Sequence, residues 1–223
     1  MDKDTREWKD AAYGQFGRIG KALSSSRRLE ILDLLSQGPK NVETLVFETG
    51  MSVANVSQHL QTLLQAHLVQ FEKRGTYALY RLTSGKIVAL SLLIQELAED
   101  LLAEVRVLRD EFFANRDSLQ PITVEELTAR MEAGEIYLID VRPKEEFEFG
   151  HIPGAISIPV SELAEHLATI EKDRPIVAYC RGRYCVYAVE AVQSLREHGF
   201  QAIRLETGVG EWKQGQKGLK NYR

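Results

Sequence analysis

Cys180 and Cys185 are the only cysteines among the 223 residues, and they lie five positions apart. A short apolar run over residues 176–179 precedes Cys180, and apolar spacing typical of a helix begins near Cys185. A thiol between a strand end and a helix start faces unpaired backbone N–H groups and the positive end of the helix dipole. This setting favours the nucleophilic thiolate, so the pattern predicts sulfur chemistry at Cys180.

Two arginines lie between the cysteines. Arg181 and Arg183 add positive charge, so we expect the loop to act on an anionic species and both arginines to belong to its catalytic group. The alternative is that the cysteines pack as small hydrophobic residues, as buried cysteines often do. Two cysteines that flank an Arg-Gly-Arg turn favour the chemical interpretation.

Cysteine usage and hydropathy indicate the cellular compartment. Two cysteines without a disulfide framework are typical of a reducing compartment. Residues 1–7 are too charged for a signal peptide, and the longest uncharged apolar stretch, residues 87–95, is too short to span a bilayer. We therefore expect a cytoplasmic protein with no membrane partner.

Charge is distributed unevenly along the chain, whose formal net charge is −4. Residues 18–86 carry nine Lys or Arg and five Asp or Glu, whereas residues 87–117 carry three and seven. A basic segment within an acidic protein is a modest electrostatic indication of nucleic-acid binding.

The pattern of elements divides the chain into two domains, residues 1–116 and 117–223. The first is predicted to be helical with one hairpin, and the second alternates strands and helices. Between them, residues 114–121 are polar and end in a proline, which is typical of a linker.

A helix-turn-helix unit is predicted in the first domain. Asn41 and Gly50 mark the two ends of one helix, and Ser52 begins the next. Two strand patterns, at residues 69–73 and 76–82, then flank a basic turn and indicate a hairpin. A helix-turn-helix followed by such a hairpin is an α+β winged helix-turn-helix domain.

The candidate DNA-contacting residues lie on the polar face of the second of these helices and at the tip of the hairpin. Amide side chains suit base edges in the major groove, and cationic groups suit phosphates. The alternative is an ordinary solvated face, but the preceding helix, the tight turn and the basic hairpin together favour DNA. The predicted contacts are Asn55, Ser57, Gln58, His59, Gln61, Lys73 and Arg74.

A long apolar stripe follows the hairpin. Residues 87–113 form one continuous helical pattern with apolar residues at every third or fourth position. This stripe is longer than so small a domain covers by itself, so we expect a homodimer, which would suit palindromic double-stranded DNA. The alternative is packing against residues 5–25, where Trp8 and Phe16 also need a partner.

The segments at residues 56–63, 67–69 and 80–82 resemble the ArsR/SmtB family of winged-helix repressors. His67 departs from that family's pattern, which often has glycine before Leu-Val. The first domain has no cysteine, and its histidines, His59 and His67, are eight positions apart, which is not a metal-ligand spacing on one helix turn. We expect no metal and no cofactor.

The second domain contains four motifs in the order of the rhodanese family: residues 138–142, residues 146–156, the cysteine loop and residues 208–212. It resembles a rhodanese-like domain, which implies an α/β fold with a parallel sheet. The resemblance places the family's nucleophile at Cys180 and implies that loop backbone N–H groups, around Gly182 and Tyr184, would hold an anionic persulfide. Asp140 and Arg142 would have a supporting, mainly architectural role.

The cysteine loop departs from the common rhodanese pattern Cys-x-x-Gly-x-Arg. Gly182 comes one position early, and Cys185 takes the place of the arginine. The loss of that arginine argues against efficient thiosulfate turnover, although Arg181 or Arg183 would restore positive charge. Cys185 would instead be a resolving thiol that attacks a Cys180 persulfide, closes a disulfide and releases sulfide. The alternative role of Cys185 is a packed residue at the helix start.

These features predict a transcriptional repressor whose rhodanese module senses or transfers reactive sulfur, such as thiosulfate, polysulfide or a low-molecular-weight persulfide. One alternative is a sulfurtransferase enzyme that carries the winged helix as a targeting domain. Phosphatase or arsenate-reductase chemistry would need arginine at position 186, which is Val186. An inert rhodanese shell is disfavoured because Cys180 is present.

Overall fold

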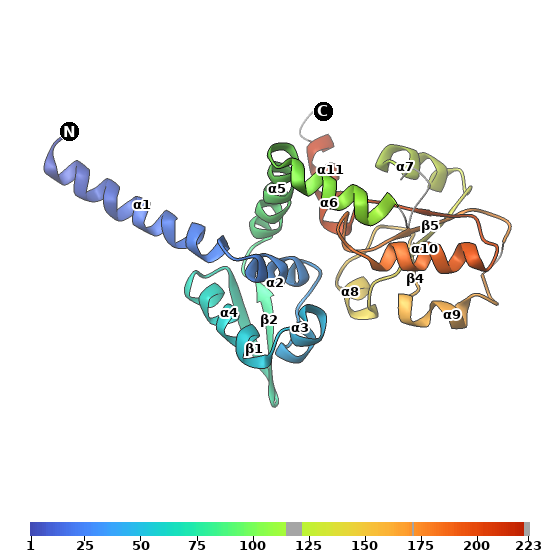
Figure 1. Ribbon diagram of the computed structural model, residues 1–223, viewed down its shortest axis with the longest axis horizontal. Helices are drawn as coiled ribbons and strands as arrows, with labels where there is room; N and C mark the ends of the chain where they lie inside the picture. Colours follow the sequence, from blue (N-terminus) through green and yellow to red (C-terminus); the bar gives the residue numbers. More distant parts are fainter. Residues whose placement is uncertain (115–121, 171, 221–223) are drawn as a thin grey trace. The chain divides into compact units, whose positions relative to one another are not determined.

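The computed structural model describes residues 1–114, 122–170 and 172–220. The chain forms two compact units, Met1–Ser91 and Leu92–Arg223, which we describe separately (Figure 1). Residues 115–121 of the predicted linker, and with them the predicted domain boundary after residue 116, lie outside the described residues. Among the helices of the described ranges, none is long and apolar enough to cross a membrane.

The predicted caps at Asn41, Gly50 and Ser52 form in the first unit. The Asn41 side chain accepts the Thr44 N–H at 2.7 Å, and Ser52 accepts the Asn55 N–H at 3.3 Å. Gly50 has a φ of 65°, the left-handed conformation that glycine adopts readily at a helix end. The elements are α1 (Lys3–Leu23), α2 (Ser26–Ser36), α3 (Val42–Thr49), α4 (Val53–Gln65), β1 (Val69–Arg74), β2 (Tyr77–Leu82) and the first part of α5 (Gly85–Leu101).

The antiparallel hairpin of β1 and β2 is the wing. Gly75 stands in its turn with a φ of 60°. Lys40, between α2 and α3, exchanges two backbone hydrogen bonds with Tyr80 of β2, at 2.9 and 2.8 Å. The wing is thereby attached to the helix-turn-helix, and the predicted winged helix-turn-helix fold is confirmed.

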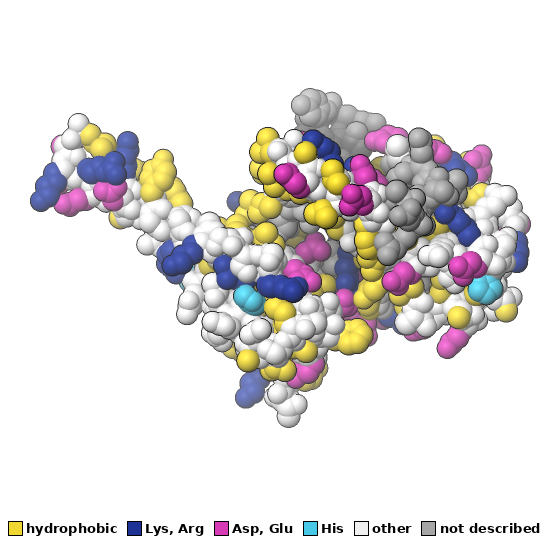
Figure 2. Space-filling model, in the orientation of Figure 1, with side chains coloured by type: hydrophobic (Ala, Val, Ile, Leu, Met, Phe, Trp, Pro, Cys, Tyr) yellow, Lys and Arg dark blue, Asp and Glu magenta, His cyan; other side chains and the backbone are white. Residues whose placement is uncertain are grey.

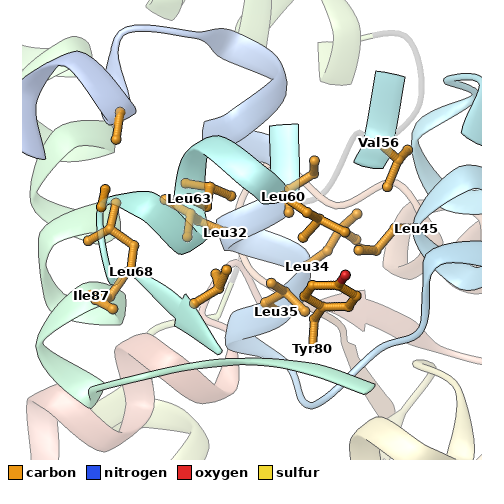
Figure 3. Close-up of a cluster of buried hydrophobic side chains, with 14 of the residues drawn as sticks. Leu32, Leu34, Leu35, Leu45, Val56, Leu60, Leu63, Leu68, Tyr80 and Ile87 are labelled. Carbon is orange, nitrogen blue, oxygen red and sulfur yellow. The ribbon is translucent and has the colours of Figure 1, made fainter. Parts of the chain in front are cut away.

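The core of the first unit joins its helices to the wing (Figure 3). Leu32 of α2, Leu45 of α3 and Leu60 and Leu63 of α4 are fully buried, and Tyr80 of β2 packs into the same cluster. Because α4 buries its apolar face here, its polar face is left toward solvent.

The second unit is an α/β domain with a parallel sheet, as predicted. Its strands follow the order β4-β3-β5-β6, and every adjacent pair is parallel. The elements are the end of α5, α6 (Ala103–Ala114), α7 (Val124–Glu132), β3 (Tyr137–Asp140), α8 (Lys144–Phe149), β4 (Ile156–Ser157), the short 3-10 helix η1 (Val160–Glu162), α9 (Leu163–His166), β5 (Ile176–Tyr179), α10 (Tyr187–Glu197), β6 (Ala202–Arg204) and α11 (Val209–Lys220).

Strand β5 explains why the segment before the cysteine loop is continuously apolar. Ile176, Ala178 and Cys180 belong to one hydrophobic cluster, and Val177 and Tyr179 belong to another. Successive side chains point to opposite faces of a sheet, and a strand covered on both faces is apolar throughout. The alternation directs Cys180 into the cluster that contains Ala188, Ala191, Val192 and Leu195 of α10.

The prediction of one continuous helix over residues 87–113 is wrong. Helix α5 ends at Leu101 and α6 begins at Ala103. The Arg106 guanidinium donates hydrogen bonds to the backbone carbonyls of Glu99 and Asp100. In an unbroken helix these carbonyls would accept backbone N–H groups four residues onward, so Arg106 satisfies them where the helix stops.

Candidate functional site

The cysteine loop connects the C-terminal end of β5 to α10. Cys180 is 2% exposed, and the loop turns at Gly182, whose φ is 136° and whose carbonyl accepts the Cys185 N–H at 3.1 Å. Helix α10 begins at Tyr187, two residues later than predicted. The first turn of a helix presents N–H groups without intrahelical partners, so the loop leads directly into an anion-favouring helix end.

Cys180 and Cys185 are joined by a disulfide in the structure, with their Cα atoms 6.3 Å apart. This separation is within the roughly 4.4–6.8 Å usual for disulfides. Neither sulfur is a thiolate in this state, so nucleophilic chemistry at Cys180 requires reduction first. The role of Cys185 as a resolving thiol stays a prediction.

Arg181 is bound to a carboxylate of helix α8. Its Nε donates to Glu146 Oε2 at 3.0 Å and its Nη2 donates to Oε1 at 2.7 Å. The side chains are 9% and 2% exposed, and the guanidinium also lies 5.2 Å from the centre of the Tyr187 ring. A buried bidentate pair of this kind holds the loop backbone in place.

Arg183 and Tyr184 are bound to Glu99, near the end of α5. The Arg183 guanidinium donates a short hydrogen bond to Glu99 Oε2, and the Tyr184 hydroxyl donates to Oε1 at 2.6 Å. Arg109 lies 3.5 Å from the same carboxylate. Burial, together with the bond to Glu99, raises the pKa of Tyr184 to about 12. Both arginines of the loop are therefore paired with carboxylates, and their predicted catalytic role stays a prediction.

The loop is also held from the start of α11. A β-carbon placed on Gly208 would lie 2.4 Å from the carbonyl oxygen of Arg181, so the backbones approach more closely than a side chain permits. The Gly208 N–H donates to the Glu211 carboxylate, which would lie 3.1 Å from a β-carbon on Gly182. Here glycine is required because two backbone segments meet.

Asp140 and Arg142 form a buried ion pair at the end of β3. Arg142 Nη2 lies 2.6 Å from Asp140 Oδ2 and 2.8 Å from the carbonyl of Gly150. The Tyr179 hydroxyl accepts the Ile152 N–H at 3.0 Å. Burial and the nearby Asp140 carboxylate raise the pKa of Tyr179. This network joins β3, β5 and the turn after α8, and the supporting role of Asp140 and Arg142 in the site stays a prediction.

The predicted DNA-contacting residues of α4 lie on its outer side. Asn55, Gln58 and Gln61 are exposed, and Ser57 and His59 are half-buried. Three amide side chains at three-residue spacing thus form a row along the helix, and such groups bind base edges in a major groove.

Lys73 and Arg74 are exposed at the end of β1, beside the turn of the wing. In Figure 2 dark-blue Lys and Arg atoms lie at the lower end of the first unit, where Figure 1 draws this hairpin. Arg74 Nε lies 3.2 Å from Glu72, but both side chains are more than half exposed, and such pairs are weak. Lys73 and Arg74 are accessible to a phosphate backbone.

Several partners of the cysteine loop were not predicted from the sequence. Glu146 lies in one of the rhodanese motifs, and Glu211 lies three positions after Gly208 in another. Membership of these motifs was a signal that could have indicated both residues as partners of the loop. Glu99 lies in the apolar stripe at residues 87–113. Nothing in the sequence indicates that it binds Arg183 and Tyr184.

Two family models match the chain. The model for bacterial regulatory proteins of the arsR family matches residues 25–70, and the model for the rhodanese-like domain matches residues 123–215. The chain is also 45% identical over 205 residues to the HTH-type transcriptional regulator Rv0324 of Mycobacterium tuberculosis. The matched region covers 92% of this chain and 90% of that protein. The chain belongs to the ArsR family of bacterial transcriptional regulators, in a form that carries a rhodanese-like domain.

Two further similarities each cover one part of the chain. The putative sulfurtransferase YtwF of Bacillus subtilis is 34% identical over 104 residues, covering 46% of this chain and 98% of that protein. A homodimeric winged helix-turn-helix DNA-binding domain, residues 1–100 of Mb0332 from Mycobacterium bovis, has 40% sequence identity and a TM-score of 0.40. This similarity covers 42% of this chain and 87% of that structure.

Proposed function

We propose that this transcriptional regulator takes up sulfur on Cys180 as a persulfide, and that the sulfur state of the cysteine loop changes its affinity for DNA. The disulfide between Cys180 and Cys185 is the observation that carries the proposal. Cys180 lies where the rhodanese family has its nucleophile, and a second cysteine within bonding distance gives the loop a way to discharge a persulfide.

The proposed chemistry has two steps. The Cys180 thiolate attacks the outer sulfur of a donor; with an organic hydropersulfide, a Cys180 persulfide forms and the thiolate of the donor leaves. The Cys185 thiolate then attacks the Cys180 sulfur, so that the disulfide forms and hydrosulfide leaves. Two thiols are oxidised by two electrons while the transferred sulfur is reduced to sulfide, and a cellular thiol resets the loop by reducing the disulfide.

The DNA-binding form is proposed to be a homodimer. Helix α1 exposes Trp8, Tyr13 and Phe16, each more than 60% accessible, and Figure 2 shows hydrophobic side chains along this helix. In the second unit, Leu93 and Leu97 of α5 are each nearly half exposed. Large exposed apolar side chains of this kind mark a protein interface, and a two-fold dimer would place two α4 helices on a palindromic site.

The test compares DNA binding and protein mass in one sample. Reduced wild-type protein, Cys180→Ser and Cys185→Ser are treated with a persulfide donor, and each is measured by intact mass and by fluorescence anisotropy with its operator duplex. We expect the wild type to lose two hydrogens as the disulfide closes, and Cys185→Ser to retain the added sulfur. DNA affinity should change with donor in the wild type and stay constant in Cys180→Ser. Sulfur uptake by Cys180→Ser equal to that of Cys185→Ser would overturn the proposal.

A second candidate is a sulfurtransferase enzyme with the winged helix as a targeting domain, which the similarity to YtwF favours. It predicts sustained transfer of sulfur from Cys180 to an added thiol or cyanide. It also predicts that DNA affinity is the same before and after sulfur loading, so the same anisotropy measurement separates the two functions.

A further inference from the structure

The two loop arginines differ in how firmly their carboxylates hold them. Arg181 and Glu146 are nearly inaccessible, so their pair is part of the domain interior. The Arg183 side chain is 38% exposed, and its partner Glu99 is 11% exposed at the edge of a groove. Arg183 is therefore the loop cation that a small change at Glu99 would release toward an incoming anion.

The surroundings of Arg183 are dominated by negative charge. Burial lowers the pKa of the Arg183 guanidinium, but the carboxylates of Glu99, Glu211 and Glu206 outweigh burial, so the pKa is raised overall. Tyr184 donates its hydroxyl to the same Glu99 carboxylate, so both side chains just before Cys185 are bonded to one residue.

A groove of about 420 Å³ opens over this cluster within the second unit. Its lining carries four carboxylates and one guanidinium, that of Arg183, which is already paired with Glu99. The lining residues are Leu92, Gln95, Glu96, Glu99, Asp100, Arg183, Glu211 and Gln214. An anion that approaches Arg183 through this groove meets an unfavourable potential, and a dianion meets twice the penalty of a monoanion.

We propose that Glu99 determines the donor specificity of the cysteine loop, by withholding Arg183 from dianionic donors such as thiosulfate. The loop then takes sulfur from singly charged or uncharged donors, of which organic hydropersulfides are the matching chemical class. This inference rests on the proposed sulfur uptake at Cys180. Glu99 acts through Arg183, so it is a positioning residue and not a nucleophile.

The test uses two donors that deliver the same sulfur atom but differ in charge. Thiosulfate is a dianion, and its leaving group is sulfite. The methanethiosulfonate anion is a monoanion, and its leaving group is methanesulfinate. In both reactions the Cys180 thiolate becomes a persulfide anion, and cyanide then removes the outer sulfur as thiocyanate. The full-length chain is used in a Cys185→Ser background, so that the persulfide is not consumed by disulfide closure.

Glu99→Gln keeps an acceptor for Tyr184 but removes the charge that holds Arg183. We expect kcat/KM to rise about tenfold for thiosulfate and about threefold for methanethiosulfonate, because the electrostatic effect scales with donor charge. Glu197→Gln, an exposed change at the end of α10, removes the same charge elsewhere and should alter neither value by more than about twofold. When Arg183→Gln is added, the gain from Glu99→Gln should disappear.

An equal change for both donors, or a gain that persists without Arg183, would overturn the role of Glu99 while leaving sulfur uptake intact. If neither donor loads Cys180 in any variant, the proposed function fails, and the specificity inference fails with it. Circular dichroism and the melting temperature of each variant exclude a folding defect as the cause of a lower rate.

Discussion

Arg181 and Glu146 form a buried bidentate ion pair that joins the cysteine loop to α8. Arg181 Nη2 lies 2.7 Å from Glu146 Oε1, and the side chains are 9% and 2% exposed. Glu146 therefore neutralises the charge of Arg181 inside the domain. Arg183 is the more accessible cation of the loop. The pair also makes the loop sensitive to changes in α8, a helix that contains no predicted catalytic residue.

Glu146→Gln should destabilise the second unit by about 3 kcal/mol, because the buried Arg181 charge then loses the Glu146 carboxylate. Urea denaturation followed by Trp212 fluorescence measures this, in a Trp8→Phe background so that the signal comes from the second unit. Glu162→Gln is the matched control, since its partner Lys144 lies 2.7 Å away at the surface with 57% of its side chain exposed. If Glu162→Gln lowers the free energy of unfolding as much as Glu146→Gln does, the burial of the Arg181 ion pair is not the cause.

Gly208→Ala should distort the cysteine loop, because the new β-carbon would lie 2.4 Å from the backbone oxygen of Arg181. We expect a loss of about 1–3 kcal/mol in stability, as for overpacked sites, and sulfur uptake slower than in the wild type. Gly215→Ala, within α11, is the control, since nothing lies within 4 Å of its β-carbon position. The rate of persulfide formation is measured for both variants by mass spectrometry. Equal rates for Gly208→Ala and Gly215→Ala would refute the steric explanation.

His67→Gly should stabilise the first unit by up to about 1 kcal/mol, because left-handed backbone is costly for residues with a β-carbon. His67 follows the end of α4 with a φ of 56°, a left-handed conformation that glycine adopts without strain. His67→Ala keeps the β-carbon and should show no gain. Denaturation followed by circular dichroism compares the three proteins; a gain for alanine equal to that for glycine would exclude backbone strain as the cause.

Tyr184 should remain protonated at a pH where free tyrosine is half ionised, because its pKa is raised to about 12 from about 10. A raised pKa means that the folded state favours the neutral hydroxyl. The contribution of the neutral Tyr184 hydroxyl to stability is complete below pH 10 and is lost as the pH rises toward 12. Difference absorbance of tyrosinate between wild type and Tyr184→Phe measures the titration. Glu99→Gln should shift it to lower pH, and an unchanged titration would contradict the bond to Glu99.

Gln58→Ala should reduce discrimination between operator and non-operator DNA by about 1–3 kcal/mol, if Gln58 contacts a base edge. Lys73→Ala with Arg74→Ala should instead weaken all duplexes alike and reduce the slope of log affinity against log salt by about 2. Anisotropy titrations at several salt concentrations separate these effects. A uniform loss of affinity for Gln58→Ala would remove it from the base-contacting set.

Features that depend on neighbours in sequence were predictable. The capping roles of Asn41 and Ser52 act over three residues, and the left-handed turn at Gly50 needs only glycine itself. The alternating burial of β5 follows from its continuous apolar run, so the place of Cys180 at a strand end was predictable too. Each of these depends on local geometry, which repeats with a known period.

Contacts between distant segments were decided by the tertiary structure. Glu146 is 35 residues from Arg181, and Glu99 is 84 residues from Arg183, so no helical or strand period relates these pairs. The break between α5 and α6 was also not predictable, although the residues involved are close in sequence. Arg106 donates to backbone carbonyls six and seven residues earlier, a side-chain contact that the apolar spacing of the segment does not indicate. A charged side chain finds its partner only when the fold has brought the two together, and the electrostatic setting of the cysteine loop depends on those partners.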